Sequence, residues 1–291
     1  MNIENYLKDW KKKIDDKLSE HLPSEEEYPQ LLHKAMRYSV LSGGKRIRAI
    51  LMITAYSLSG GNEFDKIMPV SSAIELIHSY SLIHDDLPSM DDDDYRRGGL
   101  SCHKKFGEGI AILAGDALFS HAFYLISHSN IKADLKEKIL KVLTEAIGNQ
   151  GIIGGQIEDI LSDSNRKEPK LLRYIHSHKT ASFFSAVCEI GAILAGASKD
   201  KILASRKGGL FIGMAFQIQD DVLDVEGKKE ELGKEVKKDN DKLTYPLVYG
   251  VDFSKRIAKK YSMLALKHLS ILKDNDGIFE NLLNYLLGRR N

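Results

Sequence analysis

The sequence has 291 residues, of which 43% are hydrophobic and 29% are charged. This length allows one large domain or two ordinary ones, with enough apolar residues for a real core. The charges balance to a net +1, which excludes a global field that would attract nucleic acid or anionic lipid.

The sequence shows no sign of export or of membrane insertion. The two cysteines, Cys102 and Cys188, are too few for a disulfide framework, and we expect both to be reduced. The first residues, MNIENYLKDWKKK, lack the apolar core of a signal peptide, and we expect no apolar run to approach the roughly 20 residues needed to span a bilayer. We therefore expect a cytoplasmic protein without an integral membrane segment.

Helical spacing of apolar residues recurs along most of the chain, whereas strand patterns are nearly absent. One stripe runs from Ile3 to Leu18, and a second comprises Leu31, Ala35, Tyr38 and Leu41. The segment 110–126 is apolar nearly all round, which predicts a helix buried inside a bundle. No linker, repeat or low-complexity tract divides the chain. The simplest prediction is one all-α domain over residues 1–291.

Two basic motifs could bind an anion. In GGKRIR, Gly43 to Arg48, the glycines can end a helix or let the backbone approach an anion, and Lys45 and Arg48 are predicted to share one helical face. Taken alone, this motif is more typical of a surface turn. Arg96 and Arg97 form the second pair, directly after an acidic stretch.

The acidic stretch DDLPSMD follows a helix-like run, IELIHSYSLIH. Asp85 and Asp86 are predicted to close that helix, and Pro88 then bends or ends it. With a break at Pro88, Asp91 can turn back toward Asp85. The alternative is an acidic corner between a helix and a loop. A calcium loop fits poorly, because the oxygen ligands lack EF-hand spacing.

A second acidic cluster lies in LFIGMAFQIQDDVLDV. On one helix, Gln217, Asp220, Asp221 and Asp224 form a single polar stripe. Burying carboxylates is costly unless they are paired or coordinate a metal, although an acidic surface helix is an equal alternative for this cluster alone. Two such clusters on facing helices would suit Mg²⁺, which prefers carboxylates together with substrate phosphates.

Further cations occur in two polar segments. Lys179 and Thr180 lie in HSHKT, which alone is typical of a polar helix start. The charged stretch 227–242 is predicted to be a loop or lid, and most lysines of such a segment, including Lys234 and Lys242, are solvated.

Together, GGKRIR, DDLPSMD, HKT and FQIQDDVLD resemble the trans-isoprenyl diphosphate synthases in order and separation, most closely the bacterial-type farnesyl diphosphate synthases. The resemblance extends from about Leu31 to about Gly250. It implies the isoprenoid synthase fold, an all-α bundle of ten or more helices around a deep central cavity, usually as a homodimer. It also implies a prenyltransferase that joins isopentenyl diphosphate head to tail to dimethylallyl or geranyl diphosphate, with Mg²⁺, through an allylic carbocation.

The resemblance also assigns roles to single residues. The metal ions, three with substrate bound, would be held by Asp85, Asp86, Asp91, Asp220, Asp221 and Asp224. The allylic substrate would contact Arg96, Lys179, Thr180, Gln217 and Lys234. The isopentenyl diphosphate pocket would comprise Lys45, Arg48, His78 and Arg97, and Lys242 matches a lid lysine. The residues tied most closely to catalysis would be Asp85, Asp91, Lys179, Thr180 and Asp220.

Product length should depend on residues one or two turns before Asp85. In the family an aromatic residue five positions before the motif acts as a floor, and Tyr80 matches it, beside Ser81. This pattern is similar to that of enzymes that stop at fifteen carbons, so we expect farnesyl diphosphate. On its position alone, without the resemblance, Tyr80 would be interpreted as an ordinary core aromatic.

Several alternatives remain open at this stage. The enzyme could make geranyl or geranylgeranyl diphosphate, or the chain could be a catalytically silent synthase subunit. A terpene cyclase would not need an isopentenyl diphosphate pocket, and a metal-binding structural protein would not need the basic clusters. The run GIAILAGDALFSHAF resembles dimer-interface helices of the family, with plain core packing an equal alternative. We expect His84 to be structural. We assign no chemical role to GGQIED or to Asp116.

Overall fold

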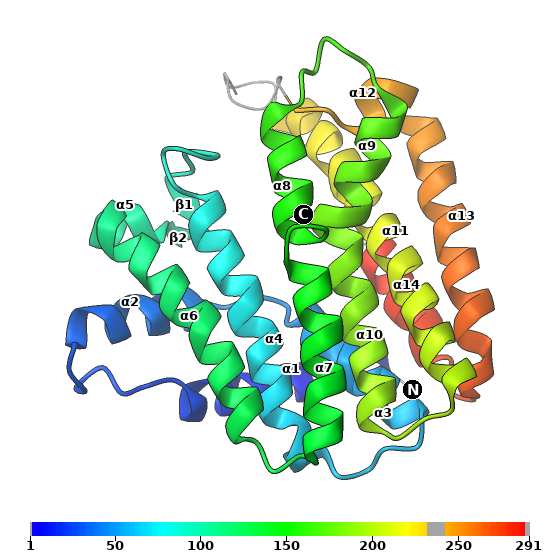
Figure 1. Ribbon diagram of the computed structural model, residues 1–291. Coiled ribbons are helices and arrows are strands. Elements are labelled where there is room, and N and C mark those ends of the chain that lie inside the picture. The colour runs from blue at the N-terminus through cyan, green and yellow to red at the C-terminus, as the bar shows by residue number, and fades with distance from the viewer. Residues whose placement is uncertain (1, 232–241, 289–291) are drawn as a thin grey trace. The chain divides into compact units, whose positions relative to one another are not determined.

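The computed structural model describes residues 2–231 and 242–288, and their regular structure is almost entirely helical (Figure 1). This confirms the all-α prediction. The chain divides into two compact units. The N-terminal unit comprises residues 2–53 and 62–136, and the C-terminal unit comprises residues 54–61 and the described part of 137–291.

The N-terminal unit is built around the helix that ends in the first acidic motif. Its elements are α1 (Ile3–His21), α2 (Gln30–Leu41), the first part of α3 (Ile47–Leu58), α4 (Phe64–Asp85), β1 (Tyr95–Arg96), β2 (Gly99–Leu100), α5 (Cys102–Phe106) and α6 (Glu108–His128). Helix α4 is buried along most of its length and packs along α6 (Figure 1). The core of this unit therefore holds the end of α4 in place.

The two apolar stripes predicted for the N-terminal helices agree with the observed burial to different degrees. In α1, Leu7, Ile14 and Leu18 are buried, as predicted. In α2, Ala35 of the predicted stripe is fully buried, but Leu31 is 50% exposed, and the buried face also includes Met36 and Val40. The predicted stripe is therefore only partly right, because spacing allowed more than one apolar face on this helix and packing selected one that overlaps it.

Helix α6 corrects two predictions. It is long and apolar enough to cross a membrane by length and composition alone, contrary to the expectation that no such run exists. It is also not buried all round, because Ile112, Leu113 and Tyr124 are exposed. Its other face, with Ala114 and Leu118, lies in the core, and core helices pass the same length test. The expected interior helix is therefore a half-buried one.

A short hairpin joins the first acidic motif to α5. β1 and β2 pair antiparallel, with Arg96 opposite Gly99, and the two turn residues Arg97 and Gly98 both have positive φ. This is the geometry of a type I′ turn, which favours glycine at its second position. Strand patterns did not predict this hairpin because each strand has only two residues.

The C-terminal unit is centred on the helix that bears the second acidic motif. It contains most of α7 (Ala133–Ile147), and then α8 (Ile152–Leu161), α9 (Pro169–Ile175), the π-helical turn η1 (His176–Ala181), α10 (Ser182–Leu194), α11 (Lys199–Glu231), α12 (Tyr245–Tyr249), α13 (Val251–Leu269), η2 (Ser270–Leu272) and α14 (Ile278–Gly288). Helix α11 packs against α10 and α13 (Figure 1). Gly209 permits the close approach to α10, because a Cβ there would lie 2.4 Å from the carbonyl oxygen of Phe184.

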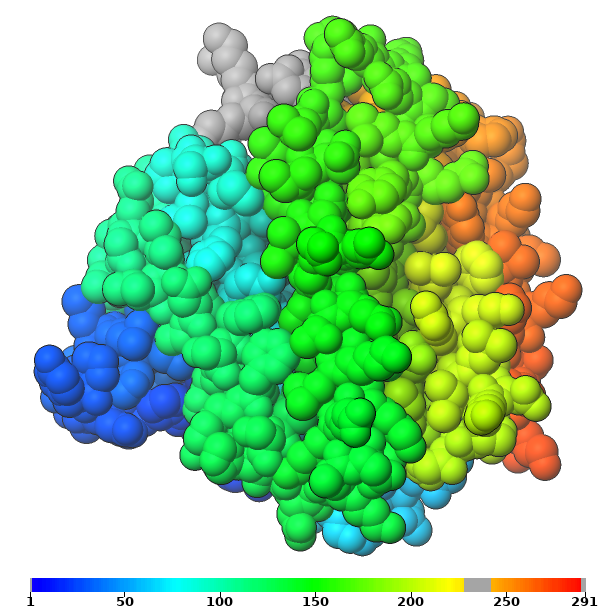
Figure 2. Space-filling view, in the orientation of Figure 1, coloured from blue at the N-terminus to red at the C-terminus, as the bar shows by residue number. Residues whose placement is uncertain are grey.

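Helix α8 lies at the surface of the C-terminal unit, where Figure 2 shows it in green. Its outer face is apolar: Ile153, Ile157, Ile160 and Leu161 are all at least half exposed. Such a run of large apolar side chains on one exposed face is unusual for a surface that meets only water.

Candidate active site

The first acidic motif folds as a turn that brings its ends together. Helix α4 ends at Asp85, with Asp86 as its C-cap. The backbone amide of Asp91 then donates a hydrogen bond of 2.9 Å to the carbonyl oxygen of Asp85. This confirms that the chain turns back after Pro88. The Asp85 and Asp91 side chains are both partly exposed.

Asp86 has a different environment from its neighbours. It is 2% exposed and is held by the guanidinium of Arg96, whose Nε lies 2.9 Å from the Asp86 carboxylate. Arg96 also binds Asp93 at 3.0 Å. Burial raises the pKa of Asp86, and the hydrogen bond from Arg96 offsets part of that increase. Asp86 therefore holds Arg96 in place and is shielded from solvent.

One group beside this motif was not singled out from the sequence. Asp92, Asp94 and His103 each offer a possible ligand atom, and these atoms lie within 4.8 Å of one another. Lys104 already binds Asp94, with its Nζ 2.8 Å from a carboxylate oxygen. The His103 ring contacts Ser101 through Nδ1 at 3.1 Å. Because an ammonium group already neutralises part of this cluster, we do not count it as a separate metal site.

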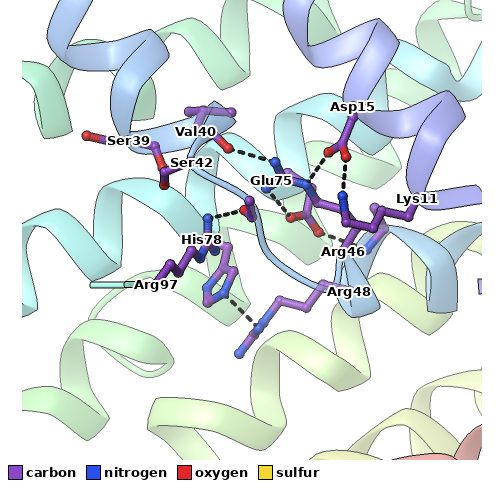
Figure 3. A network of polar contacts seen from close by, with 12 residues as sticks. Lys11, Asp15, Ser39, Val40, Ser42, Arg46, Arg48, Glu75, His78 and Arg97 are labelled. Atoms are coloured by element: carbon purple, nitrogen blue, oxygen red, sulfur yellow. Dashed lines mark hydrogen bonds and ion pairs between the residues drawn. The ribbon is translucent and has the colours of Figure 1, made fainter. Parts of the chain in front are cut away.

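A cluster of cations, shown in Figure 3, belongs to the same unit as the first acidic motif. Arg48 Nη1 lies 3.1 Å from His78 Nε2, and Arg97 Nη1 donates to the carbonyl oxygen of Gly43 at 2.5 Å. Burial, together with Arg48 and Arg97, holds the pKa of His78 well below its ordinary value. His78 is therefore neutral here, and the arginines supply the positive charge.

The structure corrects the expected geometry of GGKRIR. Helix α3 begins at Ile47, so Lys45 precedes the helix and does not share a helical face with Arg48. Lys45 is exposed, and Arg48 is in the first turn. Gly43 and Gly44 have φ values of 109° and 121°, which L side chains rarely adopt. These glycines, rather than helical spacing, shape the segment.

The second acidic motif forms the predicted stripe on α11, but its members differ in exposure. Asp220 is partly exposed and Asp224 is exposed, whereas Asp221 is only 4% exposed. Asp221 accepts hydrogen bonds from the backbone amide of Tyr245 at 2.9 Å and from Gln217 Nε2 at 3.1 Å. Burial raises the pKa of Asp221 to about 7. In both motifs, then, the second aspartate is buried and already hydrogen-bonded.

The HSHKT segment is not a helix start. It forms the π-helical turn η1 between α9 and α10, and such turns frequently occur at functional sites. Thr180 donates a hydrogen bond of 2.7 Å to Gln217 Oε1, which links η1 to α11. Lys179 Nζ lies 2.5 Å from a carboxylate oxygen of Asp159. The adjacent residues Lys179 and Thr180 of η1 therefore contact two different helices, α8 and α11.

GGQIED, to which no chemistry was assigned from sequence, lies on α8 and contacts η1. Asp159 is the partner of Lys179, and a Cβ at Gly155 would lie 2.2 Å from the backbone nitrogen of Lys179. The side chain of Gln156 is buried, and neither its amide oxygen nor its nitrogen has a hydrogen-bond partner among the described residues. The paired glycines were the available signal, because they often mark a close backbone approach.

The candidate product-length residues lie on α4. Tyr80 is 8% exposed, and its ring packs edge-on against Phe119 of α6, with 4.8 Å between ring centroids. Ser81 donates a hydrogen bond of 2.9 Å to the carbonyl oxygen of His78. His84 Nε2 lies 3.1 Å from the carbonyl oxygen of Ile112, a packing contact that agrees with its expected structural role.

The carboxylates suit a hard divalent cation. Asp85, Asp91, Asp220 and Asp224 all keep some exposure at or near the ends of their motifs, and oxygen ligands with room for water are what Mg²⁺ prefers. The two motifs belong to different units.

Of the remaining predicted site residues, Lys242 is exposed, and Lys234 lies outside the described residues. The predicted loop is partly wrong, because α11 continues to Glu231.

These features define an all-α protein with aspartate-rich motifs and a separate cation cluster. Residues 29–275 match the model of a family described as polyprenyl synthetase. The chain belongs to the polyprenyl synthetase family. It is accordingly a prenyltransferase of the trans-isoprenyl diphosphate synthase kind.

Relatives with different products resemble the chain to a similar degree. It is 40% identical over 280 residues to the farnesyl diphosphate synthase of Bacillus subtilis (strain 168), covering 94% of each chain. It is 44% identical over 274 residues to the heterodimeric geranylgeranyl pyrophosphate synthase large subunit 1 of Arabidopsis thaliana, covering 90% of this chain and 73% of the relative. The apo crystal structure of a FPP/GFPP synthase from Zymomonas mobilis has a TM-score of 0.86 and 31% identity, covering 98% of this chain and 99% of that chain.

Proposed function

We propose that the protein is a farnesyl diphosphate synthase. It would condense isopentenyl diphosphate with dimethylallyl diphosphate and then with geranyl diphosphate, head to tail. The full sequence, residues 1–291, would act as one polyprenyl synthase domain. The observation that carries the proposal is the cation cluster of Arg48, His78 and Arg97, which lies in the same unit as the first aspartate motif. A terpene cyclase has no use for a second, metal-independent diphosphate site.

The roles proposed for the carboxylates follow from their environments. Asp85, Asp91, Asp220 and Asp224 would bind Mg²⁺ directly, and Asp86 and Asp221, buried and hydrogen-bonded, would belong to the metal site through the geometry they hold. Bound Mg²⁺, three ions in all with substrate present, would neutralise charge that develops on the departing diphosphate.

Other side chains would orient the allylic substrate. Arg96 and Lys179 would bind its diphosphate, together with Lys234, while Lys242 would close over it. Thr180 and Gln217, already hydrogen-bonded to each other, would present polar oxygens near the allylic cation. Apolar walls would exclude water, which would otherwise trap that cation. The proton lost after bond formation would go to the released diphosphate, so no side chain need act as a nucleophile.

The cations of the other pocket would bind isopentenyl diphosphate without metal. Arg48 and Arg97 present fixed positive charge, and neutral His78 can donate a hydrogen bond. Lys45, which is exposed before helix α3, would add a further cation. Two substrates with the same diphosphate group would thus be distinguished by how their charge is neutralised.

We further propose fifteen carbons as the product length, a homodimer as the assembly and the cytoplasm as the location. The buried Tyr80 ring, packed against Phe119, supports the first. The exposed apolar side chains of α6 support the second. The free, buried state of both cysteines is compatible with a reducing compartment.

The test is an incubation of the purified protein with labelled isopentenyl diphosphate, dimethylallyl diphosphate and Mg²⁺, beside a chelated control and an Asp220→Asn variant. The products are dephosphorylated and sized. Metal-dependent farnesol that is lost in the variant would support the reaction, the motif and the chain length together. Geranylgeraniol or geraniol would retain the reaction and overturn the product length. No product from a folded, magnesium-binding protein would favour a catalytically silent subunit.

A further inference from the structure

The segment before α3 carries two adjacent cations in opposite environments. Lys45 is exposed, whereas Arg46 is 2% exposed and its side chain is fully buried. The Arg46 guanidinium donates to a carboxylate oxygen of Asp15 at 2.7 Å, to the carbonyl oxygen of Val40 at 2.7 Å and to Glu75 Oε2 at 3.4 Å (Figure 3). Two carboxylates thus neutralise Arg46, which leaves it little charge to offer a diphosphate.

Glu75 connects Arg46 to the start of α3. It lies on α4 and is 1% exposed, and its other oxygen, Oε1, accepts a hydrogen bond from the backbone amide of Ala49 at 3.3 Å. That amide is in the first turn of α3, beside Arg48. Glu75 also precedes His78 by one helical turn. The same carboxylate therefore fixes the backbone on which Arg48 stands.

The segment needs such support because its backbone is unusual. Arg46 has φ of 52°, in the left-handed region that non-glycine residues rarely occupy. Local preference would not hold Arg46 there, so its tertiary partners must do so. Arg97 is tied to the same segment through the carbonyl oxygen of Gly43, at 2.5 Å. A shift of this segment would move both arginines of the pocket.

Asp15 brings the N-terminal helix into the cluster. It lies on α1, and its carboxylate binds both Arg46 and, at 2.5 Å, the ammonium of Lys11. Partial burial opposes ionisation, yet the hydrogen bonds from Lys11 and Arg46 lower the pKa of Asp15 overall. Asp15 is thus an ionised carboxylate through which α1 contacts Arg46.

We propose that Asp15, Arg46 and Glu75 form a positioning cluster through which helix α1 sets the affinity of the Arg48–His78–Arg97 pocket for isopentenyl diphosphate. The cluster does not touch the substrate. It holds the segment 43–48 in the one backbone conformation that presents the pocket cations together. This inference rests on the proposed function for the identity of the ligand.

The test measures binding of isopentenyl diphosphate by calorimetry, without divalent metal, for the wild type and for Asp15→Asn. We expect the variant to bind about tenfold more weakly, because Arg46 loses a charged partner. In turnover, KM for isopentenyl diphosphate should rise, while KM for dimethylallyl diphosphate and the product length stay unchanged. Asp16→Asn is the matched control, since Asp16 is exposed on the same helix and the change in charge is identical. Asp15→Glu should restore most of the affinity.

Glu75→Gln provides a second variant, which keeps an acceptor for the Ala49 amide and removes the charge facing Arg46. It should also weaken binding of isopentenyl diphosphate. It therefore tests the proposal if Asp15→Asn does not fold. Wild-type affinity in a folded Asp15→Asn or Glu75→Gln variant would overturn the positioning role. Equal losses in Asp15→Asn and Asp16→Asn would overturn it too, since a general charge effect would suffice. A wild-type protein that neither binds nor consumes isopentenyl diphosphate would instead refute the proposed function.

Discussion

His78, which we propose binds isopentenyl diphosphate, also affects the stability of the fold. Arginine has only donors, so Arg48 at 3.1 Å requires an unprotonated Nε2 on His78. Protonating that nitrogen would break the contact and place a third positive charge beside Arg48 and Arg97. The pKa of His78 is accordingly far below its ordinary value, with burial as the largest cause.

This environment makes stability depend on pH. As the pH falls through about 6.5, the unfolded chain binds a proton at His78 that the folded protein does not, so stability falls with pH. We expect His78→Gln to lose less stability than the wild type between pH 7 and pH 5, by roughly 1 kcal/mol per pH unit at most. Urea unfolding at a series of pH values measures this difference, and parallel curves for the two proteins would contradict it.

Tyr80 is the residue on which the proposed product length depends. The edge-on contact with Phe119 fixes its ring, and the ring is almost fully buried. Tyr80→Ala should shift products from farnesyl toward geranylgeranyl and longer diphosphates, because it removes the proposed floor. Chromatography of the dephosphorylated products measures the shift. Phe123→Ala removes a partly buried ring one turn beyond Phe119 on α6 and serves as an aromatic-truncation control. An unchanged distribution in Tyr80→Ala would refute the floor.

At the scale of elements, the contact between α8 and η1 positions the proposed allylic site. The backbones approach closely at Gly155, and Asp159, one turn further along α8, binds Lys179. The π-helical geometry of η1 places Lys179 toward α8 while Thr180 reaches Gln217 on α11. Neighbouring residues can thus contact two different helices.

Gly155→Ala tests this arrangement. The added Cβ would lie 2.2 Å from the Lys179 backbone nitrogen, so α8 and η1 would have to separate. We expect a loss of about 1–3 kcal/mol in the free energy of unfolding, together with a raised KM for the allylic diphosphate. Gly109→Ala in α6 is the control, because no described atom beyond its chain neighbours and the backbone of its own helix lies within 4 Å of its Cβ position. A stable Gly155→Ala enzyme with unchanged kinetics would show that the close approach is not needed.

At the scale of the whole molecule, the exposed apolar residues of α6 bear on assembly. Ile112 and Leu113 are 44% and 55% exposed, and exposed apolar patches often mark protein interfaces. If a second copy covers this face, Leu113→Glu should weaken the dimer at least tenfold, because a charge would be buried in an apolar contact.

Sedimentation measurements over a range of protein concentrations test this prediction. Leu203→Glu is the matched control, since Leu203 is 48% exposed on α11. A wild-type protein that remains monomeric at micromolar concentration would refute the proposed homodimer. A Leu113→Glu variant that stays as dimeric as the wild type would place the interface elsewhere.

The helical class and the principal motifs follow from local patterns in the sequence. Apolar spacing identified α1, and the separation of Gln217 from Asp221 and Asp224 set one polar stripe on α11, because 3.6-residue periodicity is local. The end of α4 at Asp85 and the return of Asp91 followed from Pro88, which also acts locally.

Long-range packing sets how deeply each of these residues is buried and which distant group it contacts. Asp86 and Asp221 look like their neighbours in sequence, but burial and distant partners, Arg96 and Tyr245, separate them from the exposed carboxylates. Arg46 likewise appeared as one cation in a basic motif, and contacts from α1 and α4 make it a buried structural one. Partner choice depends on long-range packing, which local periodicity does not encode. The same packing determines which carboxylates are buried and which keep some exposure to solvent.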